Sequence, residues 1–153
     1  IVISHWVRMK CRFGCEDYGT RVACPPNLPP ISECREFFSE FSEAVIFHFE
    51  RVFEDPEERH AWTREIDERL YAIEREIFLS GYHKAFVIYI DPCDYCGNCT
   101  PDKRDCKHPR KVRPSLEGLS VDVFSTVRSC GYEIEVLSDY NQKMNRYGML
   151  LIE

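Results

Sequence analysis

The sequence of 153 residues lacks several features that would place it in a familiar class of proteins. It contains no run of about 18 or more apolar residues, so we expect no membrane-spanning helix. It also lacks a glycine-rich phosphate loop and the HExxH and GxSxG motifs, which are the usual short signatures of NTPases, zincin proteases and esterases. The CxxxCxxC motif of radical S-adenosylmethionine enzymes is missing too. Internal repeats and low-complexity tracts are not seen.

Other absences bear on location and on binding partners. No basic segment followed by an apolar one opens the chain, so no signal peptide is visible and we expect a cytoplasmic protein. A formal net charge of -6 argues against nucleic-acid binding by the chain as a whole, because phosphate neutralisation needs clustered Lys and Arg. The nine cysteines are odd in number and tightly clustered, which argues against a secreted disulfide framework. We therefore interpret them chiefly as thiolate ligands.

What the chain does contain is typical of a globular protein. Its 44% apolar and 13% aromatic residues can form a core without help from a metal. Hydrophobic patterns predict an α/β fold: one domain over residues 1–153, with a central sheet flanked by helices and two cysteine-rich loops at about 11–30 and 91–114. The predicted strands are 1–10, 44–50, 84–90, 133–137 and 148–152, and the predicted helices are 32–42, 55–80 and 116–130.

The second loop carries the clearest chemical signal. Cys93, Cys96 and Cys99 are spaced at i, i+3 and i+6, and Cys106 follows seven residues later. Such a loop can wrap its thiolates around an iron–sulfur cubane. A structural zinc site usually takes two separated CxxC or CxxH pairs, whereas here Cys96 would belong to two pairs at once. The spacing favours a [4Fe-4S] cluster, with zinc as the alternative. His108 is interpreted as a solvated loop residue and not as a ligand.

The first loop offers three further thiols, Cys11, Cys15 and Cys24. Prolines after Cys24 are expected to hold this loop extended and to keep it out of a helix. Three thiolates on a second cluster would leave one iron open to a substrate or an outside ligand. In a rival assignment, as in two-cluster ferredoxins, Cys24 or Cys106 ligates the cluster of the other loop. Cys34 and Cys130 lie on predicted apolar helix faces, so we expect both to serve packing.

Basic residues surround the second loop. They are Lys103, Arg104, Lys107, Arg110, Lys111 and Arg113. Cations lower the cost of holding an anionic cluster, and they can also steer an acidic redox partner or an anionic substrate to the surface. An exposed charged loop without a partner is the plainer alternative. Nucleic-acid binding is disfavoured here because no aromatic residues are interleaved to stack on bases.

Read together, the two loops resemble a known family. The segments RMKCRFGCEDYGTRVACPPNLP, PCDYCGNCTPDKRDCKHPRKVRPSLEGLSVDVFSTVR and YGMLLIE are similar to the DUF2284 family of predicted metal-binding proteins of anaerobic bacteria and archaea. By this resemblance the seven loop cysteines match the family's cysteine positions, and Cys34 and Cys130 lie outside them. Members of the family usually carry further residues before the first strand, so the resemblance implies a shortened chain.

Three functions follow from these patterns. The first is an iron–sulfur protein that serves electron transfer, or an accessory redox role, for a redox partner or a larger anaerobic enzyme. The second is an enzyme that uses an open iron held by Cys11, Cys15 and Cys24. The third is a zinc-stabilised interaction module without redox chemistry.

Overall fold

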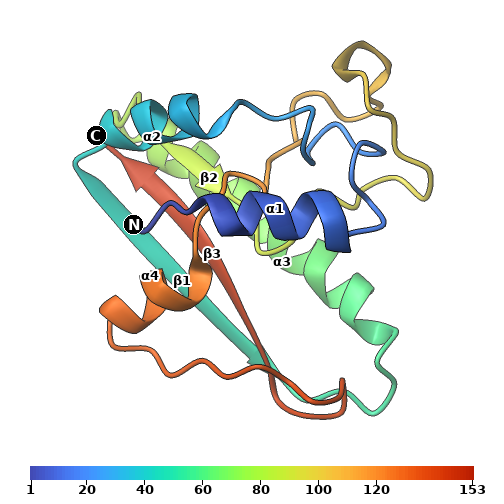
Figure 1. Cartoon of the computed structure of the whole chain (residues 1–153). Coiled ribbons are helices and arrows are strands. Elements are labelled where there is room, and N and C mark those ends of the chain that lie inside the picture. Colours follow the sequence, from blue (N-terminus) through green and yellow to red (C-terminus); the bar gives the residue numbers. More distant parts are fainter.

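The apolar C-terminal stretch forms the central strand of a small sheet. In the computed structural model, which describes residues 1–153, β3 (Met144–Ile152) pairs with β1 (Glu43–Arg51) on one side and with β2 (Phe86–Ile88) on the other. Both pairings are antiparallel, and Leu150 lies between Val45 and Val87. The predicted α/β class is therefore confirmed, with a small sheet that is antiparallel throughout (Figure 1).

Alternate strand residues face two separate cores, because side chains of a strand point to opposite faces. One face packs against α2 (Ile31–Ser39) and α4 (Val123–Ser129), and the other packs against α3 (Glu58–Leu79). Figure 1 shows α3 on the far side of the sheet from α4. The sheet is thus flanked by helices on both faces, as predicted. No helix is long and apolar enough to cross a membrane.

Three predicted helices are present, and local signals explain their ends. The Asp55 carboxylate accepts a hydrogen bond from the Glu57 amide at 3.0 Å, one residue before α3 begins. Asp122 caps α4 by accepting a hydrogen bond from the Ser125 amide at 3.0 Å. Gly131, with φ of 87°, follows the end of α4 in the left-handed region that glycine adopts without strain.

Two predicted strands are wrong. Residues 1–10 form only a single bridge, between Ile3 and Val121, before α1 (His5–Gly14) begins. The Trp6 ring nitrogen donates to the Asp122 carboxylate at 3.3 Å, so tertiary contacts hold this segment as a helix in spite of its β-branched residues. Residues 133–137 do not form the second predicted strand. The Ile134 carbonyl in this segment accepts a hydrogen bond from the Arg128 side chain and not from the backbone of a neighbouring strand. Predicted strand 84–90 is also shortened to β2.

The residues expected to serve packing have mixed outcomes. Cys34 is buried among core residues of α2, as predicted. Cys130 is exposed, so its predicted packing role is wrong; α4 ends at Ser129 and turns this thiol to solvent. His48 stacks on Tyr147 and its Nε2 lies 2.8 Å from the Asn145 carboxamide oxygen, which confirms a hydrogen-bonded histidine.

Asp67 departs from the pattern of α3. Its side chain is only 1% exposed, and neither carboxylate oxygen has a hydrogen-bond partner. Burial, with the neighbouring Asp91 charge, raises the pKa of Asp67 to about 8. The raised pKa favours the protonated form, which avoids the larger cost of burying a charge.

Leu70 anchors α3 on the sheet, where it is fully buried beside Gly148. We expect Leu70→Ala to lower the free energy of unfolding by about 2–5 kcal/mol, because it removes buried methyl groups and leaves a cavity. The matched control is Leu79→Ala on the same helix, where the side chain is 64% exposed and the loss should stay within about 0.5 kcal/mol. Urea denaturation measures both, and equal losses would contradict the assignment.

Asp67 should also make stability depend on pH. In the unfolded chain its carboxyl ionises near pH of about 4, whereas the folded pKa is about 8. The stability contributed by the protonated side chain is therefore complete below about pH 4 and is lost as the pH rises towards 8. Asp67→Asn keeps the shape without the charge, so we expect it to stabilise the protein more at pH 8 than at pH 5, by an amount of the order of a few kcal/mol. Urea titrations at both pH values test this, with the exposed Glu76→Gln as control; parallel pH profiles of Asp67→Asn and the parent would refute it.

Candidate metal centre

The first cysteine loop begins inside a helix. Cys11 lies in the last turns of α1, and Cys15 directly follows its end. The chain then folds into consecutive turns, in which the Gly19 amide donates to the Pro25 carbonyl at 2.9 Å and the Cys24 amide to the Arg21 carbonyl at 3.1 Å. The expectation of an extended loop is wrong, because these turns fold the segment back upon itself.

The turns bring the three thiols of the first loop close enough to act on one another. Burial raises the pKa of Cys24 to about 12, with smaller contributions from the charges of Asp17, Cys15 and Cys11. The pKa of Cys11 is also raised, by burial and then by the charges of Cys15 and Glu117. We call Cys11, Cys15 and Cys24 the first thiol group. Charges of both signs surround it, because Arg8, Lys10 and Arg21 lower these pKa values, but burial outweighs them and favours the protonated thiols.

The second loop leaves the sheet through buried residues. Tyr89 follows β2 and is fully buried, and its hydroxyl donates to the Lys111 carbonyl at 2.7 Å while lying 3.3 Å from the Tyr95 hydroxyl. One tyrosine thus ties the start of the loop to its return. The return is fixed to α3 as well, because Lys111 pairs with Glu68 at 2.8 Å and the guanidinium of Arg113 pairs with Glu74.

Of the four thiols of the second loop, those of Cys93, Cys99 and Cys106 lie in or against the same apolar cluster. Cys93 is buried, and burial raises its pKa to about 11, with smaller contributions from the charges of Cys99 and Cys106. Cys106 ends the short 3-10 helix η1 (Lys103–Asp105), whose turn points the chain back towards the loop. Cys96 is in the same loop and, like Cys99 and Cys106, is partly exposed. We call these four residues the second thiol group.

Arg21 joins the two loops. Its guanidinium pairs with Asp17 and with Asp94, each at 3.0 Å, and donates to the Cys93 carbonyl at 3.4 Å. Figure 1 shows both loops at the same end of the molecule. The residues just before Cys24 and just around Cys93 therefore touch, although Arg21 and Asp94 are 73 residues apart in the chain.

Sequence reasoning missed the charged residues that line this contact. Asp91 and Arg146 lie 3.4 Å apart beside a polar cavity of about 240 Å³, which both loops, α3 and β3 enclose. Burial raises the pKa of Asp91, and the nearby Arg146 opposes that rise. The carboxylates next to Cys93 in the segment DPCDYC were a signal for such a network, whereas Arg146 comes from a strand with no local signature.

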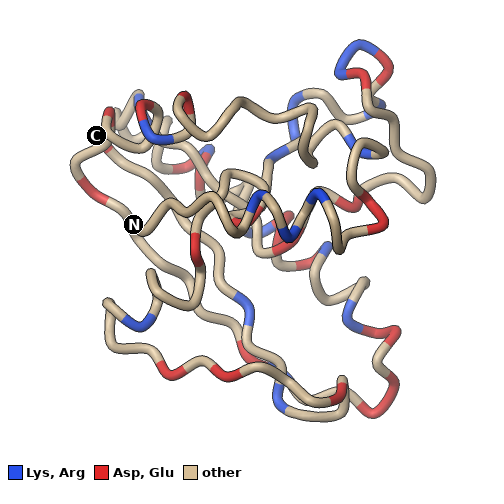
Figure 2. The backbone as a smooth tube through the Cα atoms, viewed as in Figure 1, with Lys and Arg blue, Asp and Glu red and all other residues tan.

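The six basic residues divide into two sets. Arg104 pairs with Asp102, Lys111 with Glu68 and the little-exposed Arg113 with Glu74, so these three charges are already balanced. Lys103, Lys107 and Arg110 have no ion-pair partner. Figure 2 shows acidic and basic residues side by side at the tip of the second loop. His108 is exposed, with its ring 5.7 Å from that of Tyr95.

The cysteines of both loops are present as free thiols. All nine cysteines are free of disulfides. No three His, Cys, Asp or Glu side chains converge tightly enough to hold one metal ion. A zinc ion draws its sulfur ligands to about 2.3 Å from a single point, whereas each thiolate of a cubane binds a different iron.

Comparison with known proteins agrees with these donors. The family model described as "Predicted metal-binding protein (DUF2284)" matches residues 1–152. No curated protein and no solved structure matches the chain. Since the family match spans nearly every residue and includes both cysteine loops, the protein belongs to the DUF2284 family of predicted metal-binding proteins.

Proposed function

We propose that the protein holds a [4Fe-4S] cluster on the second thiol group and uses it to transfer electrons in anaerobic metabolism. The observation that carries the proposal is that Cys93, Cys99 and Cys106 pack in or against the same apolar cluster and are free of disulfides. Four thiolates complete the usual ligand set of a cubane.

The spacing of the ligands supports a cluster over a single zinc ion. The four cysteines belong to one continuous loop and do not form two separated pairs. A cubane fills the space between thiolates that a single ion would have to draw together. Zinc remains the alternative cofactor.

The charges around the loop suit an anionic cluster. A cubane with four thiolates carries net negative charge, and the ammonium of Lys107 and the guanidinium of Arg110 are free to balance it. Three of the four thiols are partly exposed, which places the cluster near the surface where a partner can approach. The unpaired cations would steer an acidic redox protein or a larger anaerobic enzyme to this loop.

Replacing one ligand should remove the cluster. We expect Cys106→Ser, purified under anaerobic conditions, to lose about four irons and about four acid-labile sulfides per chain relative to the parent protein. Iron, sulfide and zinc analysis, together with the visible absorption spectrum, measures the loss. The matched control is Cys130→Ser, because this thiol is exposed and lies outside both groups. Zinc without acid-labile sulfide in the parent protein would instead support the zinc-stabilised interaction module and end the cluster proposal.

The first thiol group supports a second candidate function, catalysis at an open iron. It offers three thiols, of which Cys11 and Cys15 lie at the end of α1 and Cys24 lies in the turns that follow. An iron with one open position can act as a Lewis acid on a substrate.

Small ligands distinguish this candidate from simple electron transfer. If an iron is open, adding cyanide to the reduced protein should change the EPR spectrum, and Cys24→Ser should abolish the change. The signal that depends on Cys106 should stay unaltered, which serves as an internal control. A spectrum that does not respond to cyanide would leave electron transfer as the only cluster function.

A further inference from the structure

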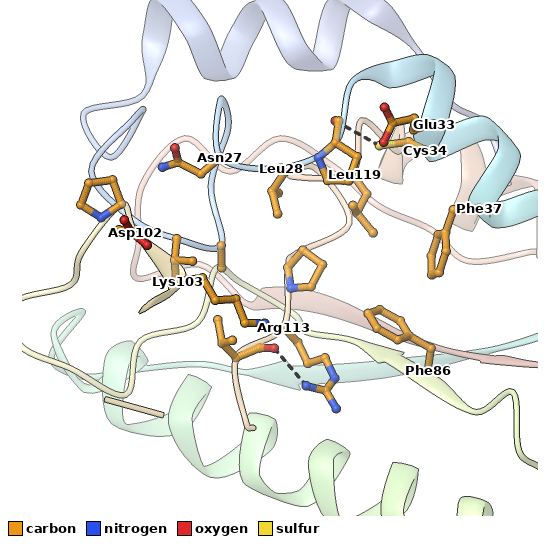
Figure 3. Close-up of a pocket in the computed structure, with 16 residues that line it drawn as sticks. Asn27, Leu28, Glu33, Cys34, Phe37, Phe86, Asp102, Lys103, Arg113 and Leu119 are labelled. Carbon is orange, nitrogen blue, oxygen red and sulfur yellow. Dashed lines mark hydrogen bonds between the residues drawn. The ribbon is translucent and has the colours of Figure 1, made fainter. Parts of the chain in front are cut away.

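A cavity of about 770 Å³ lies between the two cysteine loops. Residues 22–29 of the first loop and 101–114 of the second loop form two of its sides, and α2 and the start of β2 close it (Figure 3). Its size lies within the range of about 300–1,000 Å³ that is typical of small-molecule sites. The thiol groups and the polar cavity described above are separate from it, since the only cysteine that lines it is Cys34.

Most of the wall is apolar. Phe37 and Phe86 meet edge to face, with ring centroids 5.2 Å apart, and Leu28 and Leu119 lie on another side of the space (Figure 3). Side chains of this kind bind the hydrocarbon part of a ligand through burial. They leave its polar part to be recognised by the few charged residues of the lining.

Of these charged residues, Lys103 is the one available to a ligand inside the cavity. Arg113 is engaged by Glu74 and stacks over Phe86, and Asp102 is engaged by Arg104. Glu33 is on the exposed first turn of α2, at the rim. The ammonium of Lys103 makes no ion pair or hydrogen bond, and Figure 3 shows its side chain reaching from the Asp102 end of the cavity towards Arg113.

We propose that this cavity binds a small carboxylate with an aromatic or branched aliphatic body, its charge paired with Lys103. A single ammonium balances one carboxylate, whereas a phosphate monoester carries a charge of about −1.5 to −2, and Arg113, the other cation of the lining, is already paired with Glu74. Binding of a carboxylate in this cavity depends on the folded polypeptide and not on which metal the loops hold. A negative binding result would therefore refute this proposal and leave the cluster proposal unaffected.

The experiment uses 3-phenylpropionate as the probe, with the parent protein as purified anaerobically. Saturation-transfer NMR measures its Kd. We expect saturable binding of 3-phenylpropionate. The neutral 3-phenylpropionamide should bind at least tenfold more weakly because it lacks the negative charge. Acetate should also bind at least tenfold more weakly because it lacks the aromatic group. Lys103→Met should weaken binding of 3-phenylpropionate about tenfold, because it removes the ammonium from an exposed position without disturbing the core.

Lys107→Met is the matched control. Lys107 is an exposed lysine of the same loop that does not line the cavity, so its replacement should leave the Kd unchanged. Circular dichroism establishes that both variants are folded. The proposal is overturned if 3-phenylpropionate shows no saturable binding, if the acid and the amide bind equally, or if the two lysine variants weaken binding to the same degree.

Discussion

Both cysteine loops are rooted in one apolar core, and this burial governs the chemistry of their thiols. Val22, Ala23, Cys93 and Val112 pack in the same cluster as Leu70 of α3. Thiols at the edge of such a core ionise at a cost, which is why the pKa of Cys24 and that of Cys93 are raised. A metal centre must therefore displace protons to bind, and its affinity increases with pH. Packing, protonation and metal binding are coupled at these positions.

The ion pairs around the loops differ in strength, and the difference decides which parts are rigid. Arg113 and Glu74 are only 16% and 12% exposed, and the same Glu74 carboxylate accepts a hydrogen bond from the Val87 amide at 2.6 Å. This pair therefore fixes the return of the second loop to both α3 and the sheet. The link between the loops through Arg21 is more exposed, and solvent weakens such pairs. The second loop is thus held firmly to the fold, and the first loop is held more loosely to the second.

The sequence predicted what depends on local spacing and failed where distant contacts decide. Helix α3 follows from its apolar period and the Asp55-Pro56 start, and β1 and β3 follow from short apolar runs. Residues 1–10 resemble a strand, but contacts such as that of Trp6 with Asp122 hold them as a helix. Asp67 has the polarity of an outer face and still points inward, because protonation makes its burial tolerable. The link between Arg21 and Asp94 joins residues too far apart for any motif to reveal.

The two thiol groups differ in the number of thiols that they offer, and this contrast bears on how they would divide their work. Four thiolates complete the ligand set of a cubane, whereas three would leave one iron open. On the proposed assignment, the second group receives electrons at the surface and the first group offers an open metal position. The apolar cavity lies between the loops that carry them, but Cys34 is the only cysteine in its lining, so ligand binding there is separate from both thiol groups. The same two loops thus provide the metal ligands and the walls of a small-molecule cavity, and neither role requires the other.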